Sequence, residues 1–154
     1  MKKKTSKKTH KKSNPPAQTI LRIFTDGSGA RPDGNGSAIA WLREGDDARH
    51  VESIGGLTNN QAEYRAIISA LESVPVDSTV TILSDSQVVI YQIHGVYRVN
   101  SDSLIELRNR VNEIVILSNL TATFQWIPRT QNRADGLLKR TTKQTAPPKK
   151  ALTA

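Results

Sequence analysis

The chain has 154 residues, enough for one domain with a hydrophobic core and too few to predict two. It contains no cysteine, which excludes disulfides and thiolate metal sites and favours a reducing compartment such as the cytoplasm. The formal net charge is +8, and no apolar run is long enough to span a membrane, so we expect no membrane association.

Both ends of the sequence are basic and the middle is acidic. Residues 2–12 hold seven lysines and residues 139–150 hold five further basic groups, whereas the remaining ten basic residues, all arginine, are outnumbered by fourteen acidic ones. We predict a disordered basic tail and linker over 1–18, a domain over 19–140 and a second disordered tail over 141–154. Such tails either improve solubility or add nonspecific contacts to nucleic acid, and the sequence leaves both interpretations open.

The first three predicted elements are strands that form an antiparallel meander. A continuous apolar run predicts a central strand over 19–26, and two further patterns joined by a short turn predict strands over 36–44 and 49–56. A helix follows, with Thr58 as its N-cap and Gln61 three residues later, which is the spacing of a capping box.

Strands and helices alternate in the second half. The pattern predicts a strand over 79–85, a helix that stops at Gly95, a helix over 101–119, a strand over 121–128 and a closing helix over 132–140. Strands separated by helices form parallel crossovers, so we predict a single mixed α/β sheet with helices on its faces.

Two of the predicted strands end on an aspartate, Asp26 and Asp85. If these strands are parallel neighbours, their carboxylates emerge side by side at the carboxyl edge of the sheet, and the connections could bring Glu63 and Asp135 to the same edge. Carboxylates without a thiol form an oxygen environment that suits magnesium or manganese. Alone, Asp26 would more often cap a turn, so the metal interpretation depends on the whole set.

Four blocks of the sequence resemble the ribonuclease H type 1 family. They are FTDGS, TNNQAEYRAIISALE, SDSQVV and WIPRTQNRADGLL, which contain Asp26, Glu63, Asp85 and Asp135 in that order. The resemblance implies a ribonuclease H-like fold, a five-stranded mixed sheet of order 3-2-1-4-5 with helices on both faces. It also implies an endonuclease that hydrolyses the RNA strand of RNA/DNA hybrids, leaves 5′-phosphate and 3′-hydroxyl ends, and uses two Mg²⁺ or Mn²⁺ ions held by the four carboxylates, with Asp26 between them.

The resemblance also implies substrate contacts. Asn60 and Gln87 match positions whose amides can recognise 2′-hydroxyl groups, and Ser28, Asn59 and Arg129 are further candidates. Taken alone, Asn60 would be interpreted as a helix cap, and Gln87 and Arg129 as solvated side chains.

Two departures from the family pattern stand out. The segment between Gly95 and Ser101 is too short for the basic helix and loop of some bacterial members, so the chain resembles the protrusion-less variety. Four residues before Asp135 stands Gln131 in place of the usual asparagine, and Asn132 follows one residue later.

A second candidate function, the oligomeric state and two side chains complete these expectations. A non-catalytic module that binds hybrid or duplex on the same fold is the second candidate function, although a pure binder gains nothing by holding four carboxylates against phosphates. We expect a monomer. Trp41 and Trp126 lie in strand patterns and are expected in the core.

Overall fold

A single mixed sheet of five strands organises the fold. The computed structural model describes residues 18–32 and 36–144, with side chains as far as Lys139. The strands are β1 (Ile20–Ser28), β2 (Ser37–Arg43), β3 (Arg49–Ile54), β4 (Thr79–Ser84) and β5 (Thr121–Trp126). They lie in the order β3-β2-β1-β4-β5, with β2 antiparallel to β1 and β3, and β4 parallel to β1 and β5. The predicted meander, the parallel crossovers and the central place of the first strand are confirmed.

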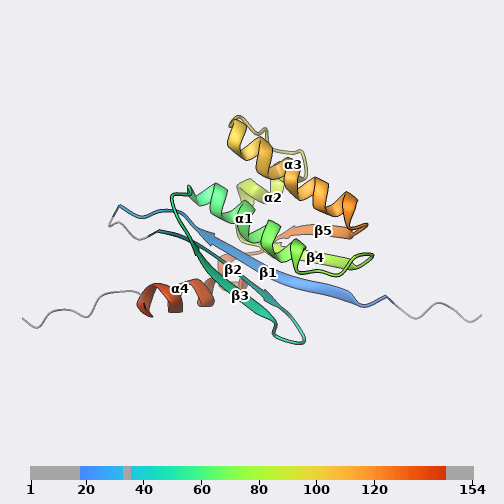
Figure 1. Cartoon of the computed structure of the whole chain (residues 1–154), viewed down its shortest axis with the longest axis horizontal. Coiled ribbons are helices and arrows are strands. Elements are labelled where there is room, and N and C mark those ends of the chain that lie inside the picture. Colours follow the sequence, from blue (N-terminus) through green and yellow to red (C-terminus); the bar gives the residue numbers. More distant parts are fainter. Residues whose placement is uncertain (1–17, 33–35, 145–154) are drawn as a thin grey trace, which may run out of the picture.

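Helices cover both faces of this sheet. They are α1 (Asn59–Glu72), α2 (Gln87–Ile93), α3 (Asp102–Leu117) and α4 (Asp135–Gln144), and a short 3-10 turn, η1, occupies Arg129–Gln131. Helices α1, α2 and α3 lie on one face, and among the described residues α4 alone lies on the other (Figure 1). The sequence predicted these helices in their order, but it placed the start of the last helix three residues too early.

The larger core lies between the sheet and α1. Tyr64, Ile67 and Leu71 of α1 are fully buried and belong to one apolar cluster with Ile23 and Ile82 of the two central strands. Burial of this kind contributes roughly 1.5–3 kcal/mol for each large apolar side chain. The predicted buried face of the helix is therefore confirmed.

A smaller core lies under α4. Leu137 and Leu138 pack with Ala38, Ala40 and Leu42 of β2. Because both faces are covered, the central strands are apolar on both sides, as the continuous run of the first strand predicted.

Three hydrogen bonds organise the start of α1, and one of them ties it to the end of β1. Thr58 Oγ1 accepts from the Gln61 amide at 3.2 Å, and Gln61 Oε1 accepts from the Thr58 amide at 2.9 Å, which confirms the capping box. Asn59 Oδ1 accepts from the amide of Gly29, just after β1, at 2.8 Å. The first turn of α1 is thereby tied to the strand it covers.

β1 continues two residues beyond its predicted end at Asp26. It pairs with β2 as far as Ser28, opposite Ala38, whereas its parallel pairing with β4 stops at Thr25, opposite Ser84. The strand does not end at the aspartate because β2 continues the ladder on the other side.

The two tryptophans differ in burial. Trp41 is 9% exposed and donates its indole N–H to Ser69 Oγ at 3.0 Å, so its place in the core is confirmed. Trp126 is 40% exposed, and the expectation that it lies in the core was wrong. It ends the edge strand β5, where packing covers only part of the ring, and its indole N–H donates to the backbone carbonyl of Asp85 at 3.2 Å.

The predicted tails fall mostly outside the described residues. Residues 1–17 and 145–154 are not among them, so the nature and contacts of the tails stay predictions. The backbone of residues 141–144 continues α4. Within the described ranges, no helix is both long and apolar enough to cross a membrane.

Gly27 allows α1 to contact β1 directly. A Cβ atom added at this position would lie 2.3 Å from the carbonyl carbon of Ala62 and 2.5 Å from the amide nitrogen of Glu63. Both obstructing atoms belong to the backbone, so no side-chain rotation could relieve the overlap. Only a residue without a side chain permits this contact.

We predict that Gly27→Ala destabilises the protein by about 3 kcal/mol, because α1 must move away from the sheet. Urea denaturation measures the change. Gly55→Ala is the matched control, since an added Cβ there meets nothing within 4 Å, and it should alter stability by less than about 0.5 kcal/mol. Equal stability of the two variants would contradict the close packing at Gly27.

Candidate metal centre

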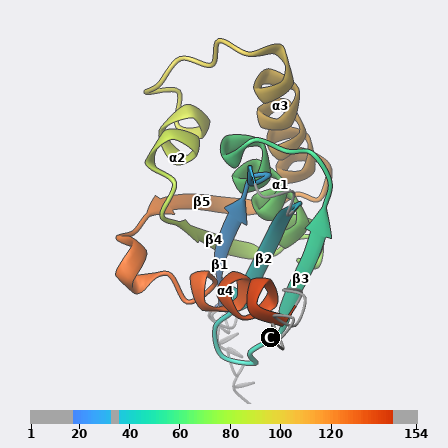
Figure 2. The same ribbon diagram turned by 90° about the vertical axis from the view of Figure 1, so that its left-hand side faces the viewer.

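Asp26 and Asp85 lie at the same edge of the sheet. The parallel ladder of β1 and β4 ends with Thr25 opposite Ser84, and each aspartate is the residue that follows its member of this last pair. Figure 2 looks toward this end of β1, with α1 above it and α4 below. The pairing of β1 with β4 thus brings together two residues 59 positions apart in the sequence.

Glu63 completes a group of three carboxylates. It lies in the second turn of α1, and the contact at Gly27 sets that turn directly over Asp26. One carboxylate oxygen from each of Asp26, Glu63 and Asp85 lies within 4.8 Å of the others. Asp26 and Glu63 are buried, and Asp85 is half-buried.

Burial raises the pKa of each of these acids, and repulsion from neighbouring carboxylates adds to the rise. Burial is the main cause for Asp26, whose pKa rises to about 7, and repulsion from Asp85 and Asp135 adds to it. Burial, followed by repulsion from the two neighbouring aspartates, raises the pKa of Glu63 well above its ordinary value. Burial also raises the pKa of Asp85, although Arg129 partly opposes the rise. The positive charge near the group is therefore too small to offset burial and repulsion.

The group fits a divalent cation. Glu63 Oε2 is buried and has no hydrogen-bond partner among the described residues, which is unfavourable unless a ligand contacts it. The available donors are carboxylate oxygens, the ligands that magnesium and manganese prefer. A bound cation would satisfy the isolated oxygen and reduce the repulsion at once.

Asp135 lies in the same cavity but in a different electrostatic environment. The cavity has a volume of about 460 Å³ and is lined by all four predicted carboxylates. Asp135 Oδ2 lies 2.6 Å from Lys139 Nζ, and its Oδ1 lies 3.2 Å from the Arg129 guanidinium. Partial burial acts to raise the pKa of Asp135, but these two cations lower it below its ordinary value.

Four of the five predicted substrate contacts line this cavity. They are Ser28, Asn59, Asn60 and Arg129. Gln87 is exposed at the start of α2 and is not among the lining residues. The side-chain oxygen of Asn59 is already bonded to the amide that follows β1, whereas Asn60 is half-buried beside it.

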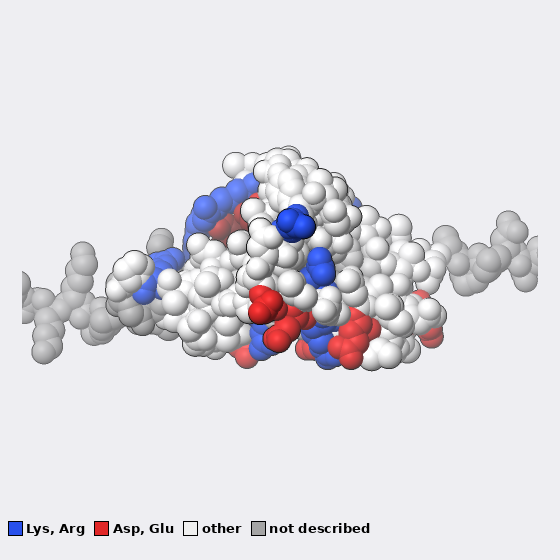
Figure 3. Space-filling view, turned by 90° about the horizontal axis from the view of Figure 1, so that it is seen from above, with Lys and Arg blue, Asp and Glu red and all other residues white. Residues whose placement is uncertain are grey.

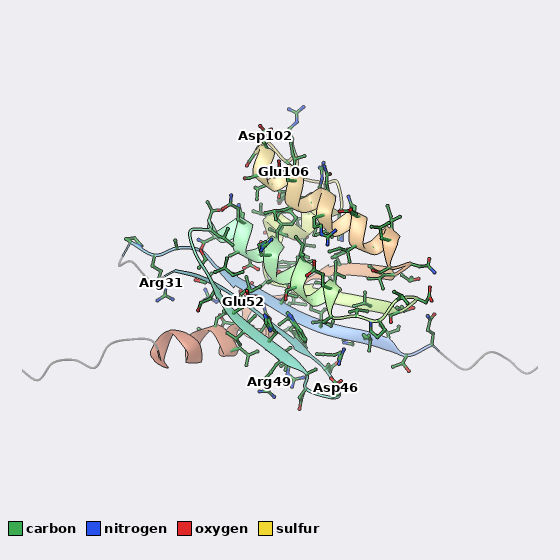
Figure 4. The ribbon with its side chains drawn as sticks, viewed as in Figure 1. Arg31, Asp46, Arg49, Glu52, Asp102 and Glu106 are labelled. Atoms are coloured by element: carbon green, nitrogen blue, oxygen red, sulfur yellow. The ribbon has the colours of Figure 1, made fainter. Side chains whose placement is uncertain are left out.

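The sequence patterns assigned no role to several other residues that line the cavity. Arg31 projects from the connection after β1 toward the side of the sheet that carries α4 (Figure 4). Ser86 and Lys139 also line the cavity. The spacing of Lys139, one helical turn after Asp135, was the available signal for that residue.

Asn132 anchors the segment that leads into α4. It is 5% exposed; its Nδ2 donates to the Thr25 carbonyl at 2.9 Å, and its Oδ1 accepts from the Ala134 amide at 3.1 Å. Its side chain also acts to lower the pKa of Asp85, against the effect of burial. These bonds hold residue 132 outside the helix, which explains why α4 starts at Asp135. An asparagine shortly before an acidic first turn was the available signal, because asparagine favours helix caps.

Comparison with known proteins found one matching family and similar solved structures. The RNase H family model matches residues 18–140. Ribonuclease HI of Halobacterium salinarum is 34% identical over 128 residues, which are 76% of this chain and 61% of that protein. The chain thus spans less than two thirds of the length of this curated relative.

Two solved structures share the fold. The crystal structure of RNase H1 from the halophilic archaeon Halobacterium salinarum NRC-1 superposes with a TM-score of 0.72 at 30% identity, covering 82% of this chain and 99% of that one. LC11-RNase H1, isolated from compost by a metagenomic approach and solved in complex with an RNA/DNA hybrid, gives a TM-score of 0.66 at 34% identity. This match covers 76% of this chain and 92% of LC11-RNase H1.

We predict that Asp26→Asn stabilises the metal-free protein at neutral pH. The pKa of Asp26 is raised from 3.8 to about 7 on folding, so the folded protein binds more protons and loses stability as the pH rises through this range. An uncharged amide avoids that loss. We expect the variant to be more stable by on the order of 2 kcal/mol at pH 8 in EDTA, with no gain below about pH 4.

Thermal unfolding across a pH series in EDTA measures this difference. Asp102→Asn, an exposed change on α3, serves as the control and should show no such gain at pH 8 (Figure 4). Added Mg²⁺ should stabilise the wild type more than Asp26→Asn. If Asp26→Asn is less stable than the wild type at pH 8 in EDTA, the ionised Asp26 carboxylate does not destabilise the folded protein.

Proposed function

Because this chain belongs to the ribonuclease H family, we propose that it is a metal-dependent endonuclease that hydrolyses the RNA strand of RNA/DNA hybrids, leaving 5′-phosphate and 3′-hydroxyl ends. The observation that carries this proposal is the close group of Asp26, Glu63 and Asp85, with an unpartnered buried oxygen on Glu63. The hybrid bound to the similar LC11-RNase H1 supports the choice of substrate.

Four carboxylates are assigned to Mg²⁺ or Mn²⁺, two ions per site. Asp26, Glu63 and Asp85 would hold one ion, and Asp26 and Asp135 would hold the other. When bound, such ions activate a water molecule and stabilise the charge that develops on the scissile phosphate. Supporting this assignment, all four residues line one cavity and every proposed ligand atom is a carboxylate oxygen.

The protein's own contribution is to hold these groups in place before substrate arrives. Gly27 fixes Glu63 over Asp26, and Asn132 fixes the segment before Asp135 to the end of β1. Groups positioned in advance need little rearrangement during the reaction, which is the main source of electrostatic catalysis.

Substrate recognition is assigned to polar groups around the same cavity. The Arg129 side chain is 72% exposed at the rim, where it can contact a phosphate. Asn60 and Ser28 lie on the α1 side and can hydrogen-bond to 2′-hydroxyl groups, with Asn59 as a further contact. Gln87, at the start of α2, is proposed as a contact outside the cavity lining. We also propose that the enzyme acts as a monomer, since one chain supplies every assigned residue. We propose that it acts in the cytoplasm, because a chain without cysteine needs no disulfide and so no oxidising compartment.

We predict that the purified protein cuts the RNA strand of an RNA/DNA hybrid and leaves double-stranded DNA intact. Labelled hybrid, double-stranded RNA and double-stranded DNA are incubated with Mg²⁺, Mn²⁺ or EDTA. Cleavage should require the metal. Asp26→Asn should remove nearly all turnover while hybrid binding remains measurable, because the backbone and rim contacts are unchanged.

Three results would count against the function. Equal cutting of double-stranded DNA would contradict the hybrid specificity, and a near wild-type rate for Asp26→Asn would mean that the site is misplaced. Hybrid binding without cleavage under any metal condition would instead favour the non-catalytic binding module.

The basic tails are proposed to strengthen hybrid binding. On the face above α1 and α3, basic and acidic side chains are interspersed and form no continuous basic field (Figure 3). The seven lysines of residues 2–12 could supply that field, although they lie outside the described residues. Lysine contacts to phosphates release counterions, which makes affinity fall with salt at a slope of about 0.9 per phosphate for duplex DNA.

We predict that deletion of residues 1–14 raises KM for a hybrid at low salt and flattens its salt dependence by about three to four slope units, the effect of losing roughly four phosphate contacts. The value of kcat should be unchanged, because the deletion touches none of the four carboxylates. Kinetics of the full-length and truncated proteins over a salt series test this. Superimposable salt slopes, with lower solubility of the truncated protein, would assign the tail to solubility alone.

A further inference from the structure

Trp126 is the large aromatic residue on which the edge strand β5 ends. Ala122 and Phe124, which precede it at alternate positions, pack against the larger core. Because side chains alternate along a strand, Trp126 lies on the same face of the sheet. It belongs to the last pair of the ladder, opposite Ser84 of β4, and it is 40% exposed. Packing in the core therefore accounts for only part of its role.

The indole N–H of Trp126 donates to the residue that follows β4. Its acceptor is the backbone carbonyl of Asp85, at 3.2 Å. Asp85 lies between Ser84, the last residue of β4, and Ser86, the N-cap of α2, so its carbonyl belongs neither to the strand nor to the helix. The bond thus joins β5 to the residue of this connection whose side chain belongs to the group of three carboxylates.

The short helix α2, which begins just after Asp85, is held by β5 at both of its ends. It has seven residues, and a helix of this length is marginal in water without tertiary contacts. The Trp126 bond holds its start, and His94 Nε2 lies 2.7 Å from the Phe124 carbonyl oxygen at its end. Figure 2 shows α2 beside the ends of β4 and β5. The backbone around Asp85 is therefore fixed partly by the edge strand.

We propose that Trp126 is a positioning residue for Asp85, because its N–H holds the Asp85 backbone in the orientation that aims the carboxylate at Asp26 and Glu63. This inference rests on the proposed metal site. The Asp85 side chain is half-buried and is repelled by the other two carboxylates, so a freed backbone would let it turn toward solvent. Groups that orient a metal ligand in this way commonly raise the affinity for the metal.

Two changes at Trp126 separate the hydrogen bond from the packing of the ring. Trp126→Phe removes the N–H and part of the ring, whereas Trp126→benzothienylalanine keeps the shape of the ring and has sulfur in place of the N–H. Trp41→Phe is the matched control, because the Trp41 indole N–H also donates a hydrogen bond, to Ser69 Oγ at 3.0 Å. Trp41 is 9% exposed and does not line the cavity.

Isothermal titration of the full chain with Mn²⁺ measures the dissociation constant without requiring cleavage. Both changes at Trp126 should weaken Mn²⁺ binding by about 3–10-fold, the effect of one lost hydrogen bond. Trp41→Phe should leave the affinity unchanged although it lowers the melting temperature more, because its ring is buried. In hybrid cleavage, the Mg²⁺ concentration for half-maximal rate should rise by the same factor in the Trp126 variants, with kcat restored at saturating Mg²⁺.

Three results would overturn the proposal. Wild-type Mn²⁺ affinity in Trp126→benzothienylalanine would show that the N–H is not needed, and equal weakening in Trp41→Phe would assign the effect to general loss of stability. Absence of Mn²⁺ binding in the wild type would remove the metal site together with this role. A wild type that binds Mn²⁺ but leaves the hybrid intact would count against the proposed function alone, since the affinities of the variants still decide the role of Trp126.

Discussion

The contact between the end of β1 and the backbone of α1 at Gly27 is the constraint on which the site depends. It forces the carboxylate that follows the parallel ladder of β1 to lie under a carboxylate from the second turn of α1. Two buried carboxylates held this close repel each other when both are ionised, and their pKa values are raised for this reason and because of burial. The protein thus uses packing free energy from its larger core to maintain a group whose repulsion is relieved by protonation or by a bound cation.

The two faces of the sheet contribute unequal parts of the cavity. The larger core, with α1 and the central strands, supplies Asp26, Glu63 and Asp85. The other face supplies Asp135 from α4, together with the cations that contact it. Negative charge is therefore concentrated where the structure is most deeply packed, and positive charge lies on the exposed side chains at the rim.

Sequence patterns predicted most of this architecture because these features depend on residues close together in the sequence. The capping box at Thr58, the apolar face of α1 and the two aspartates after apolar strands each depend on neighbouring residues. The strand order came from the resemblance to a family. What the patterns could not predict depends on contacts between distant residues: the hydrogen bond from Asn132 to β1, the exposure of Trp126 on an edge strand, and the position of Gln87 outside the cavity.

The small core under α4 has a consequence for cooperativity. Among its described side chains, Leu137 and Leu138 hold this helix against Ala38, Ala40 and Leu42 of β2, whereas α1 buries a full row of large side chains. Segments with little buried apolar surface open at lower free energy than the whole domain. α4 should therefore behave as a separate foldon, exchanging its amide hydrogens by local opening while α1 and the central strands exchange only by global unfolding. On warming, the fourth carboxylate would leave the site before the other three.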